Sequence, residues 1–317
     1  MFKLFSFSVA ALAAAAILLP SGAQAQTLVS AATQPLLSVG PATIAQDNAA
    51  SSVYSGGYNG QNGGFGFGAF NVVSNPSPST ATSFAGSFVG DATGSENGSG
   101  GGVNSSGKAF GTYANGASTG AGNPVTTATR SFNTGLTSGA TFSLDFLTGY
   151  NDGGTSGVTL LTGSSATGTG SVFQANSLGA FAAGTSVGSF VYNHNETATG
   201  GGQGAFDFNG VNTGIGYANG LIHLEYDITS PTAYTLFSTG AVKFTGSGTY
   251  SGSLSSFQFQ QTNAVGGGAD HNAFFNNLKE TAGTPVSAAP EPSQLGVLLV
   301  VCLGGLVLAA RKRLVPA

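Results

Sequence analysis

The sequence predicts an all-β protein, an antiparallel β-sandwich with glycine- and serine-rich loops. The composition points this way, because 52 of 317 residues are glycine and 6% are charged, against about 25% charged residues in an average soluble domain. Short apolar stretches recur with a period of two and are separated by Gly, Asn or Ser, which is typical of strands joined by turns. No helical pattern of comparable length precedes Leu295.

Residues 1–25 predict a secretory signal peptide. A positively charged start is followed by an apolar run over residues 4–19, and Ala23 and Ala25 form a small-x-small cleavage site. The alternative is an uncleaved membrane anchor, which the helix-breaking Pro20 beside the cleavage site disfavours. The signal predicts that the rest of the chain folds outside the cytoplasm.

Residues 26–283 are predicted to be one extracellular β-sandwich domain. Its strand-length apolar stretches are residues 65–73, 84–89, 108–113, 142–146, 158–160, 190–192, 206–208, 221–228, 234–236, 242–244 and 257–259. Within the domain, residues 94–107 are nearly all Gly, Ser and Asn. We predict a flexible loop there, because such a segment buries too little surface to order itself.

The predicted strand at residues 221–228 carries a histidine and two carboxylate side chains close together. Its period of two puts His223, Glu225 and Asp227 on one face, a candidate glycan-binding face. Two carboxylates so spaced resemble the Glu-x-Asp-x-x-Glu signature of one glycoside hydrolase family. The second catalytic Glu is missing, since Thr229 and Ser230 follow. We therefore predict no enzyme and no catalytic residue; the alternatives are a hydrolase or lyase on this face, or a plain solvent-facing strand.

Residues 270–278 resemble the closing strand of lectin-like and carbohydrate-binding jelly rolls, where a polar side chain often holds calcium. Asp270, Asn272, Asn276 and Asn277 offer oxygen ligands, and calcium takes about six to eight. Their spacing matches no known calcium-loop pattern. The prediction is therefore no metal site and no cofactor, with a structural calcium ion as the alternative.

The C-terminal part predicts a linker and a membrane-spanning helix. Residues 284–293 form the linker, and residues 294–313 contain an apolar run that ends in a basic cluster. The run, residues 295–310, would be about 24 Å long as a helix, slightly short for a hydrocarbon core of about 30 Å. The basic cluster is expected to stay cytoplasmic and consists of Arg311, Lys312 and Arg313.

This tail is similar to the PEP-CTERM sorting domain of Gram-negative exported proteins. The resemblance rests on Pro290, Glu291 and Pro292, the apolar helix and the basic cluster in that order. It implies that an exosortase recognises the tail as a substrate and cleaves near the Pro-Glu-Pro motif, after transient membrane anchoring. The extension at residues 314–317 departs from the usual pattern. An unprocessed single-pass anchor is the alternative.

The charge between the two processing sites limits the partners. Residues 26–289 carry four basic and eleven acidic residues, a net charge of −7, which argues against nucleic acid as a partner. The single cysteine, Cys302, lies in the apolar tail. We therefore predict an exported cell-surface or extracellular-matrix protein; the resemblance implies association with exopolysaccharide and biofilm. A glycan-active hydrolase or lyase on a jelly-roll fold is the alternative.

Overall fold

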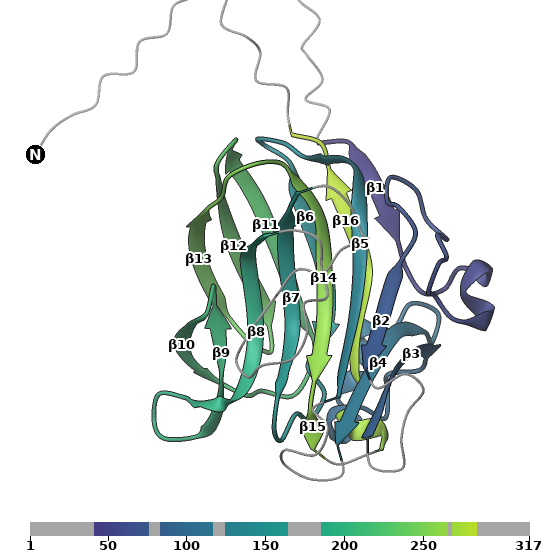
Figure 1. Ribbon diagram of the computed structural model, residues 1–317, viewed down its shortest axis with the longest axis vertical. Coiled ribbons are helices and arrows are strands. Elements are labelled where there is room, and N and C mark those ends of the chain that lie inside the picture. The colour runs from purple at the N-terminus through teal and green to yellow at the C-terminus, as the bar shows by residue number, and fades with distance from the viewer. Residues whose placement is uncertain (1–40, 76–82, 117–123, 164–184, 266–267, 284–317) are drawn as a thin grey trace, which may run out of the picture. The chain divides into compact units, whose positions relative to one another are not determined.

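The computed structural model describes residues 41–75, 83–116, 124–163, 185–265 and 268–283. They belong to the compact unit that begins at Gly40 and form two β-sheets packed face to face (Figure 1). This confirms the predicted antiparallel β-sandwich. The predicted signal peptide, linker and transmembrane helix lie outside the described residues. In the part that is described, no helix is long and apolar enough to cross a membrane.

One sheet has nine strands. In order across the sheet they are β13 (Phe244–Thr249), β12 (Ala233–Gly240), β11 (Ile222–Ser230), β6 (Thr141–Leu147), β16 (Ala273–Thr281), β4 (Ala109–Gly116) and β15 (Ala264–Val265), with β1 (Thr43–Asp47) paired to β16 and β3 (Ser83–Gly90) paired to β4. Its strand pairs are antiparallel apart from β15 with β4. Most neighbours in this sheet are distant in sequence, so its faces combine residues from several parts of the chain.

The other sheet has seven strands. In order they are β10 (Val211–Gly216), β9 (Gln203–Phe208), β8 (Thr185–Thr197), β7 (Thr155–Thr162), β14 (Leu254–Thr262), β5 (Val125–Leu136) and β2 (Asn71–Asn75). The described residues also form four short 3-10 helices: η1 (Ser52–Gly56), η2 (Glu96–Gly98), η3 (Gly100–Val103) and η4 (Ala269–His271).

Aromatic rings fill the space between the sheets. Phe142 of β6 lies 4.9 Å from Phe257 of β14 and 5.0 Å from Phe132 of β5, measured between ring centroids. On the next part of the core, Phe275 of β16 lies 4.7 Å from Phe259 of β14. These pairs join the two sheets, because each takes one ring from either side.

The structure differs from the sequence prediction over residues 94–107. In place of a flexible loop it has η2 and η3, and the side chains of Glu96 and Val103 are fully buried. Val103 packs with Leu147 and Phe274 in a small apolar cluster. Contacts with distant strands order this segment, and its composition alone does not reveal them.

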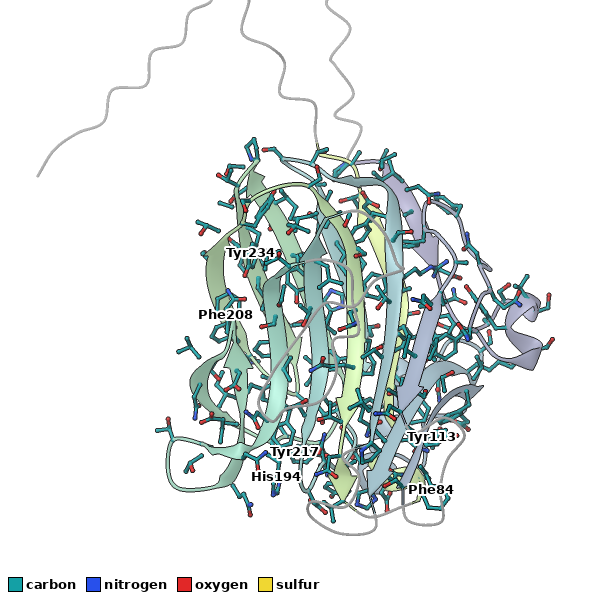
Figure 2. The ribbon with its side chains drawn as sticks, in the orientation of Figure 1. Phe84, Tyr113, His194, Phe208, Tyr217 and Tyr234 are labelled. Carbon is teal, nitrogen blue, oxygen red and sulfur yellow. The ribbon has the colours of Figure 1, made fainter. Side chains whose placement is uncertain are left out.

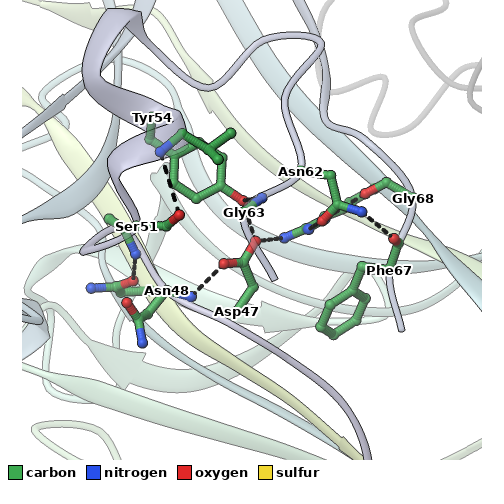
Figure 3. A network of polar contacts seen from close by, with 12 residues as sticks. Asp47, Asn48, Ser51, Tyr54, Asn62, Gly63, Phe67 and Gly68 are labelled. Atoms are coloured by element: carbon green, nitrogen blue, oxygen red, sulfur yellow. Dashed lines mark hydrogen bonds and ion pairs between the residues drawn. The ribbon is translucent and has the colours of Figure 1, made fainter. Parts of the chain in front are cut away.

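A buried ion pair between Asp47 and Arg130 fixes the N-terminal part of the sandwich to β5. Figure 3 shows the polar contacts around Asp47. Arg130 is fully buried and its Nη1 lies 2.5 Å from Asp47 Oδ2. The other guanidinium nitrogens donate to Asn62 Oδ1 and, over 2.8 Å, to the Gly68 carbonyl; the Tyr54 hydroxyl donates to Asp47 Oδ2. The guanidinium also lies over two aromatic rings, at 4.3 Å from the centroid of Phe70 and 4.8 Å from that of Phe67.

Candidate functional site

Strand β11 presents three polar side chains on the outward side of the nine-stranded sheet. Leu224 and Tyr226 point into the core and are fully buried, whereas His223, Glu225 and Asp227 are partly exposed. Successive residues of a strand point to opposite sides, so these three share one face, as the alternation in the sequence predicts. Whether this face binds a glycan stays a prediction.

A row of hydrogen bonds connects His223 to three other residues. His223 and Asp145 are partners across β11 and β6, and His223 Nδ1 lies 2.7 Å from Asp145 Oδ1. Asp145 Oδ2 accepts a hydrogen bond of 2.8 Å from Asn277 Nδ2. Asn277 Oδ1 in turn accepts one of 2.6 Å from Ser105 Oγ. We call Ser105, Asn277, Asp145 and His223 the polar row; its members hold one another in fixed positions.

A β-bulge places Asn277 in the polar row. The pairing of β16 with β6 shifts its register between Asn276 and Lys279, and Asn277 has a φ of +53°. Asn tolerates this left-handed conformation better than most residues. The extra residue lets Asn277 reach Asp145 on the outward side while Leu278 stays in the core. A bulge that re-aims a side chain in this way is common next to functional sites.

Contacts within the polar row shift the pKa of the His223 imidazole. The hydrogen bond that Asp145 accepts from His223 raises the pKa of His223 above its ordinary value; partial burial opposes this, and the charges of Asp145 and Glu225 add to it. The His223 side chain is 42% exposed, whereas that of Asp145 is 14% exposed. An accessible imidazole is thus held by a largely buried carboxylate, which can position a proton donor or acceptor.

The same face continues beyond the polar row. Glu225 is in register with Ser143 on β6 and with the half-buried Phe237 on β12. Asp227 accepts a hydrogen bond of 2.9 Å from Thr141 Oγ1. The face therefore offers carboxylates, hydroxyl groups and one aromatic ring, which are the groups that can hydrogen-bond to and stack on a sugar.

Sequence reasoning found His223 but missed the rest of the polar row. Asp145 lies in the predicted strand at residues 142–146, where apolar and polar residues alternate. This alternation predicts only that Asp145 faces solvent. Ser105 lies in the segment predicted to be flexible, and Asn277 in the strand considered for calcium. The pairing of β6 with β11 and β16 brings these residues together. No short-range pattern in the sequence predicts that pairing.

Two of the four side chains considered for calcium, Asn276 and Asn277, serve other contacts. The Asn276 amide is buried; its Oδ1 accepts from Ala49 N over 2.8 Å, and its Nδ2 donates to the carbonyls of Val103 and Lys108, each over 2.9 Å. Asn277 belongs to the polar row. Within the described ranges, no three His, Cys, Asp or Glu side chains gather in a way that could hold a metal ion.

The residues predicted to direct sorting lie outside the part of the chain that the structure describes. They are Ala23 and Ala25 of the signal peptide site, Pro290, Glu291 and Pro292 of the motif, and Arg311, Lys312 and Arg313 of the basic cluster. Their roles stay predictions.

No protein-family model matches this chain, and no curated protein matches it in sequence. Solved structures with a related arrangement include a carbohydrate esterase of the Shiga toxin-encoding bacteriophage phi24B, at 12% identity over 77% of this chain and 100% of that one, with a TM-score of 0.36. An endo-β-1,4-glucuronan lyase of the fungus Trichoderma reesei has 10% identity over 64% of this chain and 92% of that one, with a TM-score of 0.33. Lectin I-B4 of Griffonia simplicifolia has 10% identity over 50% of this chain and 82% of that one, with a TM-score of 0.25.

Proposed function

We propose that this chain is an exported cell-surface or extracellular-matrix protein whose sandwich binds polysaccharide through the outward face of the nine-stranded sheet. The polar row carries the proposal. Its carboxylate, amide and imidazole are already fixed by mutual hydrogen bonds, so a sugar that bonds to them meets little further loss of side-chain entropy.

We also propose that the protein is exported, anchored transiently in the membrane and cleaved. The signal-peptide pattern of residues 1–25 and the PEP-CTERM-like tail support export, transient membrane anchoring and cleavage by an exosortase. A low-charge surface rich in hydroxyl and amide groups suits an exopolysaccharide or biofilm matrix. The net negative charge of residues 26–289 argues against nucleic acid as the polymer bound.

A binding experiment tests the role of the polar row. The purified full-length chain is sedimented with the exopolysaccharide of its own organism, and Asp145→Asn is compared with Glu196→Gln, which neutralises a carboxylate on β8 of the other sheet. Hydrogen bonds to charged groups contribute about 1.5–3 kcal/mol, so Asp145→Asn is expected to weaken binding about tenfold or more. Equal binding by Asp145→Asn, Glu196→Gln and the unaltered chain would contradict the proposal.

The pair of His223 and Asp145 also supports a second candidate, a glycan-active hydrolase or lyase. A carboxylate that holds one nitrogen of an exposed imidazole leaves the other nitrogen for general acid–base chemistry, and Glu225 lies on the same face. Polymer length after incubation separates the candidates. A binding protein leaves the polymer intact, whereas shortening that Glu225→Gln or His223→Ala abolishes would establish the enzyme.

A further inference from the structure

Strand β13 is the last strand at one border of the nine-stranded sheet (Figure 1). It pairs with β12 without a register shift, and no other described strand pairs with it. A free edge presents unpaired backbone groups, which proteins usually protect with charged residues, proline or a β-bulge. The sequence of β13, Phe-Thr-Gly-Ser-Gly-Thr, contains no charged residue and no proline. Nothing within the strand therefore opposes the addition of another strand.

Three residues of β13 direct their backbone N–H and C=O groups to this free edge. Where the same pairing continues beyond the strand, Tyr250 N donates to the Thr232 carbonyl over 2.9 Å. In antiparallel strands, residues that bond to the neighbouring strand alternate with residues whose backbone groups face away from it. Every second residue counted back from Tyr250 therefore bonds to β12. The residues between them are Thr245, Ser247 and Thr249, and they face the free edge.

The border around β13 is uncharged and partly apolar. Residues 26–289 carry a net charge of −7, yet neither β12 nor β13 contains a charged residue. Behind the edge lie two half-buried rings, Phe244 of β13 and Phe208 of β9, with centroids 5.2 Å apart. Figure 2 shows Phe208 and Tyr234 on this side of the molecule. A second copy would meet no charge repulsion from these strands and would move the rings further from water.

We propose that β13 pairs antiparallel with β13 of a second copy of this chain, with Ser247 opposite the partner's Ser247. In this register Ser247 exchanges both backbone hydrogen bonds with the partner's Ser247, and Thr245 exchanges both with the partner's Thr249. The residues that face the edge are symmetric about Ser247, so a two-fold axis there satisfies the backbone groups of all three at once. Another protein would need a strand of matching register, whereas a second copy supplies one by symmetry.

This pairing joins the outward faces of the two copies. Thr245 is in register with Phe237 of β12 and through it with Glu225 of β11, so its side chain lies on the same face as the polar row. Side chains opposite each other across antiparallel strands share one side of the sheet, and pairs of hydroxyl-bearing residues are stabilising there. The two polar rows then lie on one side of a single continuous sheet. This inference goes beyond polysaccharide binding and does not rest on it.

Cysteine cross-linking of the purified full-length chain tests the contact. Residues that exchange both backbone hydrogen bonds have Cα atoms about 5.5 Å apart, a separation that a disulfide can span. Cys302 is the single cysteine of the chain, so a Cys302→Ala background contains no other thiol. In that background, Ser247→Cys is expected to form a covalent dimer on mild oxidation. Thr239→Cys, at an exposed position on the same side of β12, is the control and is expected to stay monomeric.

Two charge variants test the register. Thr245→Lys combined with Thr249→Lys places lysines opposite each other across the interface, whereas Thr245→Lys combined with Thr249→Asp places opposite charges there. Within one copy the two positions are exposed and about 13 Å apart along the strand, so the variants differ little as monomers. Sedimentation equilibrium is expected to give a dissociation constant about tenfold higher for the first variant than for the second.

Three results would overturn the inference: an unaltered chain that stays monomeric at every concentration, equal cross-linking of Ser247→Cys and Thr239→Cys, or equal dissociation constants for the two charge variants. Association through the apolar tail alone would give the last result, because it does not involve β13. Asp145→Asn is expected to leave cross-linking at position 247 unchanged. A failure of polysaccharide binding is therefore distinguishable from a failure of this inference.

Discussion

Glu280 is a buried carboxyl group without a partner, and it makes the stability of the protein depend on pH. It lies on β16 between Phe142 of β6 and Ala45 of β1, is 1% exposed, and has no hydrogen bond to either carboxyl oxygen. Burial raises the pKa of Glu280 from 4.5 to about 7. The folded protein therefore keeps a proton there that the unfolded chain has already lost between pH 4.5 and 7.

The direction and size of the effect follow from this difference. Below about pH 4.5 both states hold the proton, so ionisation of Glu280 adds no cost; as the pH rises, stability falls by about 1.4 kcal/mol per unit until the pKa of the folded state is reached. The whole shift amounts to about 3 kcal/mol. Glu280→Gln stays neutral at every pH, so it is expected to stabilise the fold by about 3 kcal/mol at pH 8 and hardly at all at pH 4.5.

Urea denaturation of the wild type and Glu280→Gln at a series of pH values measures this difference. With a urea slope of about 2–3 kcal/mol/M, the midpoints are expected to separate by about 1 M at pH 8. Leu278→Val, two residues earlier in the same strand, removes a methylene group from the core and should cost about 1 kcal/mol equally at all pH values. A stabilisation by Glu280→Gln that does not change with pH would refute the reasoning.

Two further predictions concern the N-terminal ion pair and the tail. Asp47→Asn leaves the guanidinium of Arg130 buried without its carboxylate, and breaking a buried pair costs about 3–5 kcal/mol; chemical denaturation at pH 7 measures the loss, and a change below about 1 kcal/mol would contradict the buried pairing. For the tail, mass spectrometry of surface material is expected to find the mature C-terminus near Pro290–Pro292 in cells that have the exosortase and an uncut tail in cells that lack it. Finding residues 311–313 still attached in wild-type surface material would refute processing.

The fold was predictable from the sequence because its signal is local. In β11, Leu224 and Tyr226 alternate with His223, Glu225 and Asp227, and a period of two by itself separates the core side from the outward side. The turn residues between the apolar stretches mark the strand ends in the same way. Neither observation requires knowledge of which strands pair.

The candidate site was only partly predictable because its signal is not local. His223 and Asp145 are 78 residues apart, and Asn277 and Asp145 are 132 residues apart. Their contact depends on the order and register of β11, β6 and β16, which the hydrophobic pattern leaves open. The ordering of residues 94–107 was missed for the same reason, since Glu96 is held by backbone groups 53 and 124 residues further along the chain.

Strand β16 connects the stability of the protein with its candidate site. The buried amide of Asn276 ties β16 to the segment before β4 through Val103 and Lys108, which fixes the place where Ser105 can meet Asn277. The bulge between Asn276 and Lys279 then turns Asn277 toward Asp145. The polar row therefore depends on a strand whose own backbone irregularity is held by a buried side chain, and a change at Asn276 is expected to weaken ligand binding and stability together.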